Sequence, residues 1–263
     1  VTPLKEQGGM SPIQKAKYHG KWIIVKRLKP ELKDNATYKS LLYKEFENTY
    51  HLDHPNIVRL LDKGEDKDGI FYTMEYVDGR SLEKLYGENG IESLDLIQKI
   101  LRQILDALTY VHKKQVYHRD LKPDNILITY RGDNVKILDF GLAAADSFDD
   151  NMTKVGTPKY AAPEQKTKGY TADHRADIYS VGLILLEMLT GKTDKRAVTG
   201  IKNEELKNIV LTCLQNNPDD RFQDCQDIFK LLNKASTISK TLPTWLEQTI
   251  KDYAKDGIIT KNE

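Results

Sequence analysis

Residue 76 divides the sequence into a strand-rich part and a mostly helical part, and this division limits the folds open to the chain. Before it, residues 22–25 and 69–74 are rich in β-branched and aromatic side chains, as strands are, and a helical stretch runs from about Thr37 to Leu52. After it, apolar residues recur three and four positions apart from Leu94 to Val111, as on the buried face of one long helix. We expect an α+β chain of two lobes.

Later segments complete this expectation. Short strands are expected at 126–128 and 135–138, within a β-rich interval, and helices resume near Asp177. We expect a small lobe with an antiparallel sheet and one main helix at 1–75, a connector at 76–79 and a mostly helical large lobe at 80–234. Residues 235–263 are expected to form a C-terminal helical extension. A cleft between two lobes is a usual place for a ligand.

Composition excludes several classes of partner. The 263 residues carry 40 basic and 39 acidic side chains, a net charge of +1, so neither nucleic acid nor a membrane surface is expected to bind through overall charge. The most apolar stretch, 181–189, includes Glu187 and falls far short of the ~20 residues of a membrane span. Cys213 and Cys225 show no metal-ligand spacing. We expect a cytoplasmic domain without a membrane segment of its own, compatible with an anchor outside this chain. No oligomeric state is predicted.

Two short motifs carry the chemistry. Residues 118–125 read His-Arg-Asp-Leu-Lys-Pro-Asp-Asn, and residues 139–141 read Asp-Phe-Gly. A lone Asp in a turn is usually a turn former or a cap. An eight-residue string followed by a second motif at this distance is much more specific, and the pair is typical of phosphoryl transfer from ATP.

The residue types in these motifs suit that reaction, which needs positioning and charge neutralisation more than covalent help. Asp120 is expected to orient an attacking hydroxyl or accept its proton, and Lys122 to place positive charge near the transferring phosphoryl group. Asn125 and Asp139 offer hard oxygen ligands for Mg²⁺, for which Mn²⁺ is an expected substitute.

These motifs resemble those of the eukaryotic-type (Hanks-type) serine/threonine protein kinases, and the resemblance covers nearly the whole chain. It implies the two-lobed protein-kinase fold and ATP as the phosphate donor. By resemblance, Lys26 is the lysine that holds the α- and β-phosphates, and Glu45, nine residues before His54, is its partner on the small-lobe helix. Glu47 is a weaker candidate for this partner. Residues 76–82 and 163–165 resemble bacterial members of the family.

The resemblance also implies an ATP pocket. Met74 would be the gatekeeper, the backbones of Glu75 and Val77 would bond adenine, and Leu127 and Ile13 would form the floor and roof. The full expected set is Gly8, Gly9, Ile13, Ile24, Lys26, Met74, Glu75, Val77 and Leu127.

Lys122 and Thr157 resemble the residues by which serine/threonine kinases recognise alcohol acceptors, so protein substrates with Ser or Thr are expected. Autophosphorylation is also expected. Ser147, Thr153 and Thr157 are candidate phosphorylation sites between the two ends of the activation segment. Ala162-Pro-Glu164 resembles the end of that segment, and Arg221 the arginine that pairs with its glutamate.

The chain departs from the family at several places. Within 6–11 only Gly8 keeps its place in the glycine-rich loop, with Gly9 added, and Ile24 stands where Ala is usual. Thr49 replaces an apolar residue expected to pack toward Phe140. The interval before residue 204 is too short for the family's docking helix, which is expected to be missing.

Two alternatives remain. A pseudokinase scaffold that binds nucleotide weakly would account for the altered loop, although Lys26, Glu45, Asp120, Asn125 and Asp139 are all present. A small-molecule kinase of the same fold would usually lack the Lys-Pro after the catalytic Asp and the Ala-Pro-Glu motif, both of which are here.

Overall fold

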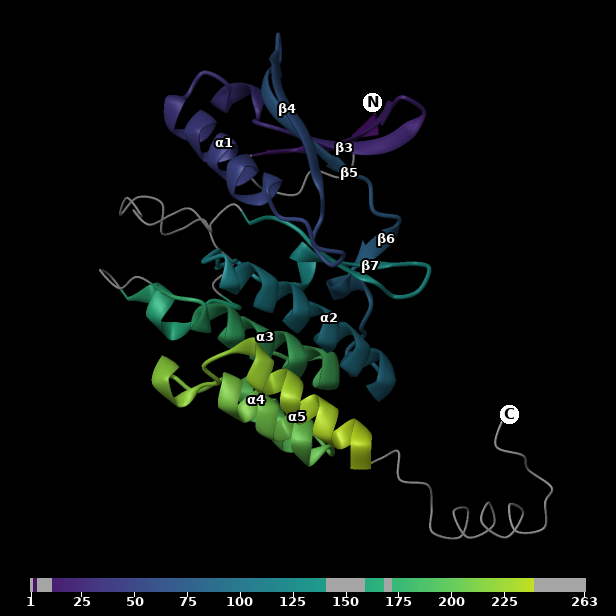
Figure 1. Cartoon of the computed structure of the whole chain (residues 1–263), viewed down its shortest axis with the longest axis vertical. Coiled ribbons are helices and arrows are strands. Elements are labelled where there is room, and N and C mark those ends of the chain that lie inside the picture. The colour runs from purple at the N-terminus through teal and green to yellow at the C-terminus, as the bar shows by residue number, and fades with distance from the viewer. Residues whose placement is uncertain (1, 4–10, 141–158, 168–171, 239–263) are drawn as a thin grey trace, which may run out of the picture.

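The structure is a computed structural model that describes residues 2–3, 11–140, 159–167 and 172–238, with only the backbone described for 2–3 and 233–238. Its elements form a small sheet-bearing lobe stacked on a larger helical lobe (Figure 1). The predicted α+β, two-lobed architecture is therefore confirmed. None of the helices within the described residues is long and apolar enough to cross a bilayer.

The small lobe is built on an antiparallel sheet of five strands in the order β1-β2-β3-β5-β4. The strands are β1 (Thr2–Pro3), β2 (Ile13–Tyr18), β3 (Lys21–Arg27), β4 (Leu60–Asp66) and β5 (Gly69–Glu75). Opposed residues of such strands point to the same face of the sheet. The pairs Ile13–Lys26, Ile24–Met74 and Lys26–Tyr72 therefore place five side chains on one face.

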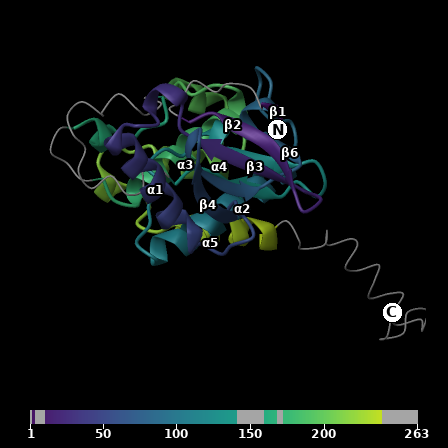
Figure 2. The same ribbon diagram turned by 90° about the horizontal axis from the view of Figure 1, so that it is seen from above.

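Helix α1 (Ala36–Tyr50) covers part of this sheet and is the helix predicted at 37–52. It begins where the side chain of Asn35 accepts hydrogen bonds from the amides of Thr37 and Tyr38, which satisfies two of the unpaired donors of the first turn. Leu42 and Phe46 are buried in the small-lobe core, and α1 contacts β4 and β5. Viewed from above, α1 lies along one side of the sheet (Figure 2).

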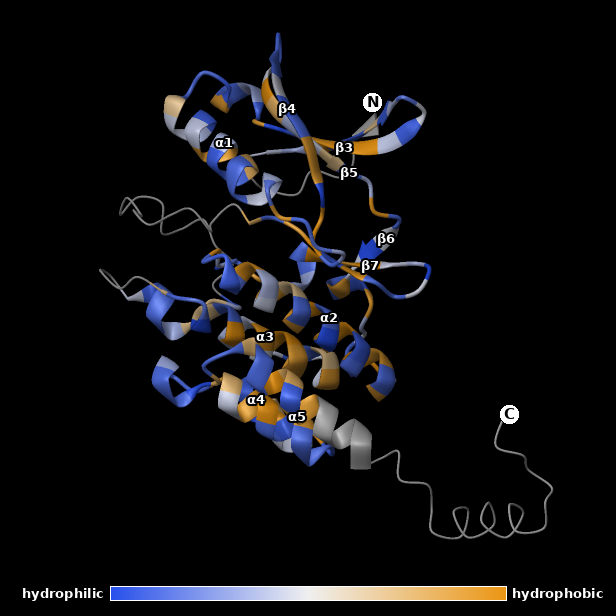
Figure 3. Cartoon of the chain, viewed as in Figure 1, coloured by the Kyte–Doolittle hydropathy of each residue, from blue (hydrophilic) through white to orange (hydrophobic). Residues whose placement is uncertain are grey.

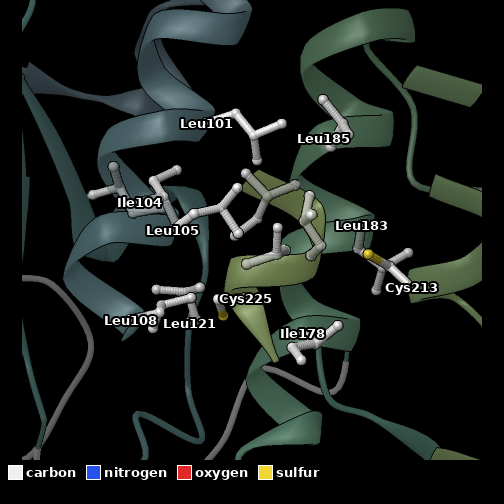
Figure 4. Packing of buried hydrophobic residues seen from close by; sticks show 14 of the residues in the cluster. Leu101, Ile104, Leu105, Leu108, Leu121, Ile178, Leu183, Leu185, Cys213 and Cys225 are labelled. Atoms are coloured by element: carbon white, nitrogen blue, oxygen red, sulfur yellow. The ribbon is translucent and has the colours of Figure 1, made fainter. Parts of the chain in front are cut away.

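The large lobe is a stack of helices. Its long helices are α2 (Leu94–Lys113), α3 (Arg175–Thr190), α4 (Glu204–Cys213) and α5 (Cys225–Ile238). Helix α3 lies between α2 and α4, and 13 of its residues, from Ala176 to Met188, are buried. It is largely hydrophobic (Figure 3) because it has neighbours on nearly every side, whereas α2 has one apolar stripe and one exposed stripe. Side chains from all four helices meet in the core (Figure 4).

A second sheet lies where the two lobes meet. It consists of β6 (Gly79–Ser81), β7 (Ile126–Thr129) and β8 (Val135–Ile137), all antiparallel. These include the two strands predicted at 126–128 and 135–138. Residues 76–78 connect β5 of the first sheet to β6 of the second, so Gly79 of the expected 76–79 connector already belongs to a strand.

Two further boundaries bear on the sequence predictions. All residues between α3 and α4 are described, and their only helix is the short 3-10 helix η6 (Lys195–Gly200), as the missing docking helix implied. Helix α5 continues to Ile238, across the expected boundary at 234. The rest of the expected C-terminal extension, 239–263, lies outside the described residues.

Candidate active site

Lys26, on β3, joins the two lobes at the centre of the site. Its Nζ lies 2.6 Å from Oε1 of Glu45 on α1 and 2.7 Å from Oδ1 of Asp139, which follows β8 by two residues. Burial alone would lower the pKa of Lys26, but the charges of Asp139 and Glu45 raise that pKa well above its ordinary value. Burial alone would raise the pKa of Asp139, and Lys26 instead holds it below its ordinary value. Lys26 and Asp139 are therefore both charged at neutral pH, whereas burial raises the pKa of Glu45 above its ordinary value against the opposing charge of Lys26.

The loop after α2 presents the second group of side chains. Lys122 Nζ lies 2.9 Å from Oδ2 of Asp120. Asn125, in the short 3-10 helix η3 (Pro123–Asn125), donates from Nδ2 to the backbone oxygen of Asp120 at 3.0 Å and to its Oδ2 at 3.4 Å. The carboxylate of Asp120 is thus flanked by one cation and one amide, and its orientation is held by both.

Asp177, on α3, holds the backbone of this loop through its carboxylate. Its side chain is fully buried and accepts hydrogen bonds from the amides of His118 and Arg119, each at 2.8 Å. Arg119 has a φ of +61°, a left-handed conformation that costs energy in a residue with a side chain. The hydrogen bonds to Asp177 stabilise this conformation just before Asp120.

Asp139 also has a left-handed backbone, with a φ of +57°. The next residue, Phe140, is fully buried, and its ring centroid lies 4.8 Å from that of His118. His118 in turn bonds the backbone oxygen of Leu138 through Nε2 at 2.8 Å. Phe140 is therefore packed into the large-lobe core, and Asp139 turns the other way, toward Lys26.

Apolar side chains lie on the sheet face that carries Lys26. Ile24 and Met74 are buried and opposed in the sheet, and Ile13 and Val77 pack against the same small-lobe core. Leu127 is half-buried on β7 of the second sheet. Ile13, Ile24, Met74 and Val77 thus belong to one apolar cluster of the small lobe and connector.

The side chain of Glu75, at the end of β5, accepts two hydrogen bonds. Its Oε1 accepts hydrogen bonds from Lys136 Nζ at 2.6 Å and from the amide of Arg59 at 3.0 Å. Lys136 lies on β8, so this ion pair ties the start of the connector to the second sheet.

Thr49, the departure on α1, is buried, and its hydroxyl donates to the backbone oxygen of Glu45 at 2.9 Å. A hydroxyl in this apolar place is thus satisfied within its own helix. Glu47, the weaker candidate for the partner of Lys26, instead contacts Lys63 at 2.9 Å. The expected residues Gly8, Gly9, Ser147, Thr153 and Thr157 lie outside the described residues.

Two residues of the site were missed in the sequence. The sequence places Asp177 only at the start of a helix, although its position within Asp177–Gly182 is a usable signal. Tyr72, whose hydroxyl donates to Glu45 at 2.8 Å, had no sequence signal, because only the strand register brings it there.

The donor set suits a divalent cation bound together with a phosphate. The Nδ2 atom of Asn125 is committed to Asp120, which leaves its carbonyl oxygen for a cation, and Asp139 has a carboxylate that is 38% exposed. Hard oxygen ligands of this kind are those that Mg²⁺ prefers, and Mg²⁺ usually takes only one or two from protein. Among the described residues no group of three His, Cys, Asp or Glu side chains could form a site by itself.

This fold, with Lys26, Glu45, Asp120, Asn125 and Asp139 gathered in two hydrogen-bonded groups, is typical of enzymes that transfer phosphoryl groups. Residues 7–247 match the model of the protein kinase domain family, so the chain belongs to that family. The structure of the Mycobacterium tuberculosis PknI kinase domain superimposes with a TM-score of 0.71 over 89% of this chain and 94% of that chain, at 23% identity, which supports the fold.

Curated bacterial proteins are similar to the chain in sequence. A probable serine/threonine-protein kinase of Clostridium perfringens is 31% identical over 253 residues, which are 87% of this chain and 37% of that protein. The kinase pkn3 of Myxococcus xanthus is 33% identical over 89% of this chain and 46% of its own length. PrkC of Bacillus subtilis is 33% identical over 70% and 32% respectively. The chain spans less than half the length of these relatives.

The resemblance to bacterial members of the eukaryotic-type serine/threonine kinases is thereby confirmed, as is the assignment to an enzyme class. Membership of this family implies ATP as a substrate and the use of a divalent metal ion. Nothing in these comparisons favours the pseudokinase alternative.

Proposed function

We propose that this domain transfers the γ-phosphate of ATP to Ser or Thr hydroxyls of protein substrates, in a reaction that depends on Mg²⁺ and accepts Mn²⁺. The observation that carries the proposal is the pairing of Lys26 with both Glu45 and Asp139, at 2.6 and 2.7 Å. Active protein kinases need this lysine–glutamate pair and the metal-binding aspartate in place together.

Lys26 would hold the α- and β-phosphates of ATP, while Glu45 fixes the position of its ammonium group. Asn125 and Asp139 would hold the metal ion, which neutralises the charge that develops on the phosphate oxygens. The lowered pKa of Asp139, caused by Lys26, would keep this carboxylate anionic for that role.

Asp120 would receive the substrate hydroxyl, orient its oxygen toward the γ-phosphate and accept its proton. Lys122, 2.9 Å from Asp120, would place a positive charge beside the transferring group, and Asn125 keeps the Asp120 carboxylate in one orientation. Electrostatic stabilisation of this kind is usually the largest contribution to catalysis.

The adenine ring would lie on the apolar surface of Ile13, Ile24, Met74 and Val77, with Leu127 opposite. The backbone oxygen of Glu75 and the amide of Val77 would bond it, and Gly8 and Gly9 would approach the phosphates. The ion pair between Glu75 and Lys136 supports this assignment, because it fixes the backbone of Glu75.

Specificity for Ser and Thr is supported by Lys122 beside Asp120 and by the names of the bacterial relatives. Thr157 is proposed to seat the acceptor residue. Ser147, Thr153 and Thr157 are proposed as phosphorylation sites, which autophosphorylation would modify.

Radiolabelled ATP with a generic protein substrate tests the proposal. Wild-type protein should label the substrate with Mg²⁺ or Mn²⁺ and not with EDTA, and acid hydrolysis should yield phosphoserine and phosphothreonine. Asp120→Asn should remove the labelling, while Asp220→Asn, at an exposed position of the large lobe, should retain it. Wild-type protein that transfers no phosphate, or equal labelling by Asp120→Asn, would refute the proposed function.

A further inference from the structure

Tyr72 of β5 makes a contact with the catalytic centre that the proposed mechanism does not use. Its hydroxyl donates to Oε1 of Glu45 at 2.8 Å, and the same oxygen accepts the hydrogen bond from Lys26 Nζ at 2.6 Å. One carboxylate oxygen on α1 is therefore bound by two donors from two neighbouring strands.

The strand register produces this arrangement. Lys26 and Tyr72 are directly opposed in the β3–β5 pair, so their side chains leave the same face of the sheet side by side. Tyr72 is 2% exposed, and its ring centroid lies 5.9 Å from that of Phe46, the neighbour of Glu45 on α1. Packing against Phe46 therefore holds the Tyr72 ring in the position from which its hydroxyl reaches Glu45.

Lys26 by itself is a poor anchor for Glu45, because it has several partners. Its ammonium already binds Asp139 as well as Glu45, and bound ATP would add phosphate oxygens. A buried carboxylate that loses its hydrogen-bond donors is costly, so α1 would tend to move whenever Lys26 turned toward the nucleotide. Among the described contacts, the Tyr72 hydroxyl has Glu45 as its one hydrogen-bond partner, and its ring is held by packing against Phe46.

We propose that Tyr72 is a positioning residue, which holds Glu45 in place through its hydroxyl and so keeps Lys26 correctly placed while Lys26 binds the phosphates of ATP. This inference rests on the proposed function of the site. Burial, with the charge of Glu45, raises the pKa of Tyr72 well above its ordinary value, so the phenol remains a hydrogen-bond donor at all working pH values.

Tyr72→Phe removes only the hydroxyl and keeps the ring that packs on Phe46. Loss of this hydrogen bond to a charged group should lower kcat/KM for ATP about tenfold. The matched control is Tyr43→Phe, which removes a hydroxyl from α1 itself, at a residue that packs against the same small-lobe core. It should leave kcat/KM within about twofold of wild type.

A double-mutant cycle separates positioning from a general loss of stability. If Tyr72 acts through Glu45, then Tyr72→Phe in a Glu45→Ala background, which removes the acceptor, should lower kcat/KM by roughly twofold or less, far less than in the wild-type background. Equal losses in the two backgrounds, or a Tyr72→Phe variant with wild-type kcat/KM, would overturn the inference.

Measurements that do not depend on turnover distinguish an error in the role of Tyr72 from an error in the proposed function. Equilibrium binding of a fluorescent ATP analogue with Mg²⁺ should weaken about tenfold in Tyr72→Phe. Amide hydrogen exchange of residues 42–49 should become faster in the nucleotide-bound protein. If the wild type bound nucleotide but transferred no phosphate, the proposed function would fail and these two measurements would still decide the role of Tyr72. Unchanged binding and exchange would exclude it.

Discussion

Arg221 and Glu164 form a buried, bidentate ion pair in the large lobe, although they lie 57 positions apart in the sequence. Nη1 and Nη2 of Arg221 each lie 2.7 Å from one oxygen of the Glu164 carboxylate. The remaining donors of the guanidinium reach the backbone oxygens of Arg175, Gln215 and Asn216. The pair expected from sequence resemblance is therefore present, and it joins the Ala-Pro-Glu segment to the helices below it.

Replacing Arg221 by Met should strongly destabilise the fold. The side chain of Arg221 is 0% exposed, and its loss would leave Glu164 as an uncompensated buried charge. We expect the free energy of unfolding in urea to fall by about 3–5 kcal/mol. Arg196→Met is the matched control, because Arg196 is 91% exposed and pairs with Asp194 at the surface. That control should change stability by less than about 1 kcal/mol. Similar values for the two variants would contradict a structural role of the buried pair.

Replacing Lys26 by Met should remove catalysis without unfolding the chain. The change takes away the only side chain that bonds both Glu45 and Asp139 among the described residues. Loss of a charge aimed at the reacting phosphates should lower kcat by roughly a hundredfold or more. Lys21→Met, at the exposed start of the same strand, should keep wild-type kcat. Circular dichroism would verify that both variants fold.

Asp139→Asn tests the proposed metal ligand separately. The amide keeps the shape of the side chain but loses its negative charge, so binding of the metal ion and phosphoryl transfer should both be lost. A titration of turnover against Mg²⁺ measures this directly. Mg²⁺-dependent turnover at the wild-type rate in Asp139→Asn would show that Asp139 is not the ligand.

Stability should depend on pH through Asp177. Burial alone would raise the pKa of Asp177, but the hydrogen bond from His112 at 2.8 Å, together with charges and amide donors nearby, holds that pKa below its ordinary value. A carboxyl whose pKa is lower when folded stabilises the protein above its unfolded pKa, about 3.9, and loses this contribution as pH falls toward the folded pKa.

Urea unfolding at pH 6 and at pH 3.5 would measure this dependence. Wild type should lose more stability over that interval than Asp177→Asn, which is less stable at pH 6 because the amides of His118 and Arg119 lose a charged acceptor. An equal loss in the two proteins would exclude Asp177 as a source of the pH dependence.

Gly191 should not tolerate a side chain. It ends α3 with a φ of +70°, and a Cβ built there would lie 2.1 Å from the backbone oxygen of Glu88. Gly191→Ala should therefore lower the free energy of unfolding by about 1–3 kcal/mol, from backbone strain and overpacking. Gly200→Ala is the matched control, because a Cβ there meets nothing within 4 Å. Equal melting temperatures of the two variants would contradict the steric argument.

Much of the fold and of the candidate site could be predicted from local patterns. The periodic apolar residues predicted α2, and the β-branched runs predicted strands β3, β5, β7 and β8, because burial of one face imposes its period on the sequence. Asp120, Lys122 and Asn125 were found together because they lie within six residues of one another. Glu45 was chosen over Glu47 by its spacing to His54, and the contact with Lys26 agrees with that choice.

By itself, then, the sequence determined the order of the elements, the two lobes and the identity of the charged groups, because these depend on spacing along the chain. Only the tertiary structure decided how distant groups share their partners. It brought Lys26 to Asp139 across 113 residues, placed Asp177 beneath the loop of Arg119, and set Tyr72 beside Lys26 on Glu45. Such contacts depend on strand register and helix packing, which no local pattern specifies. A sequence pattern can indicate that a polar side chain is buried and must be hydrogen-bonded, but it does not indicate which residue is the partner.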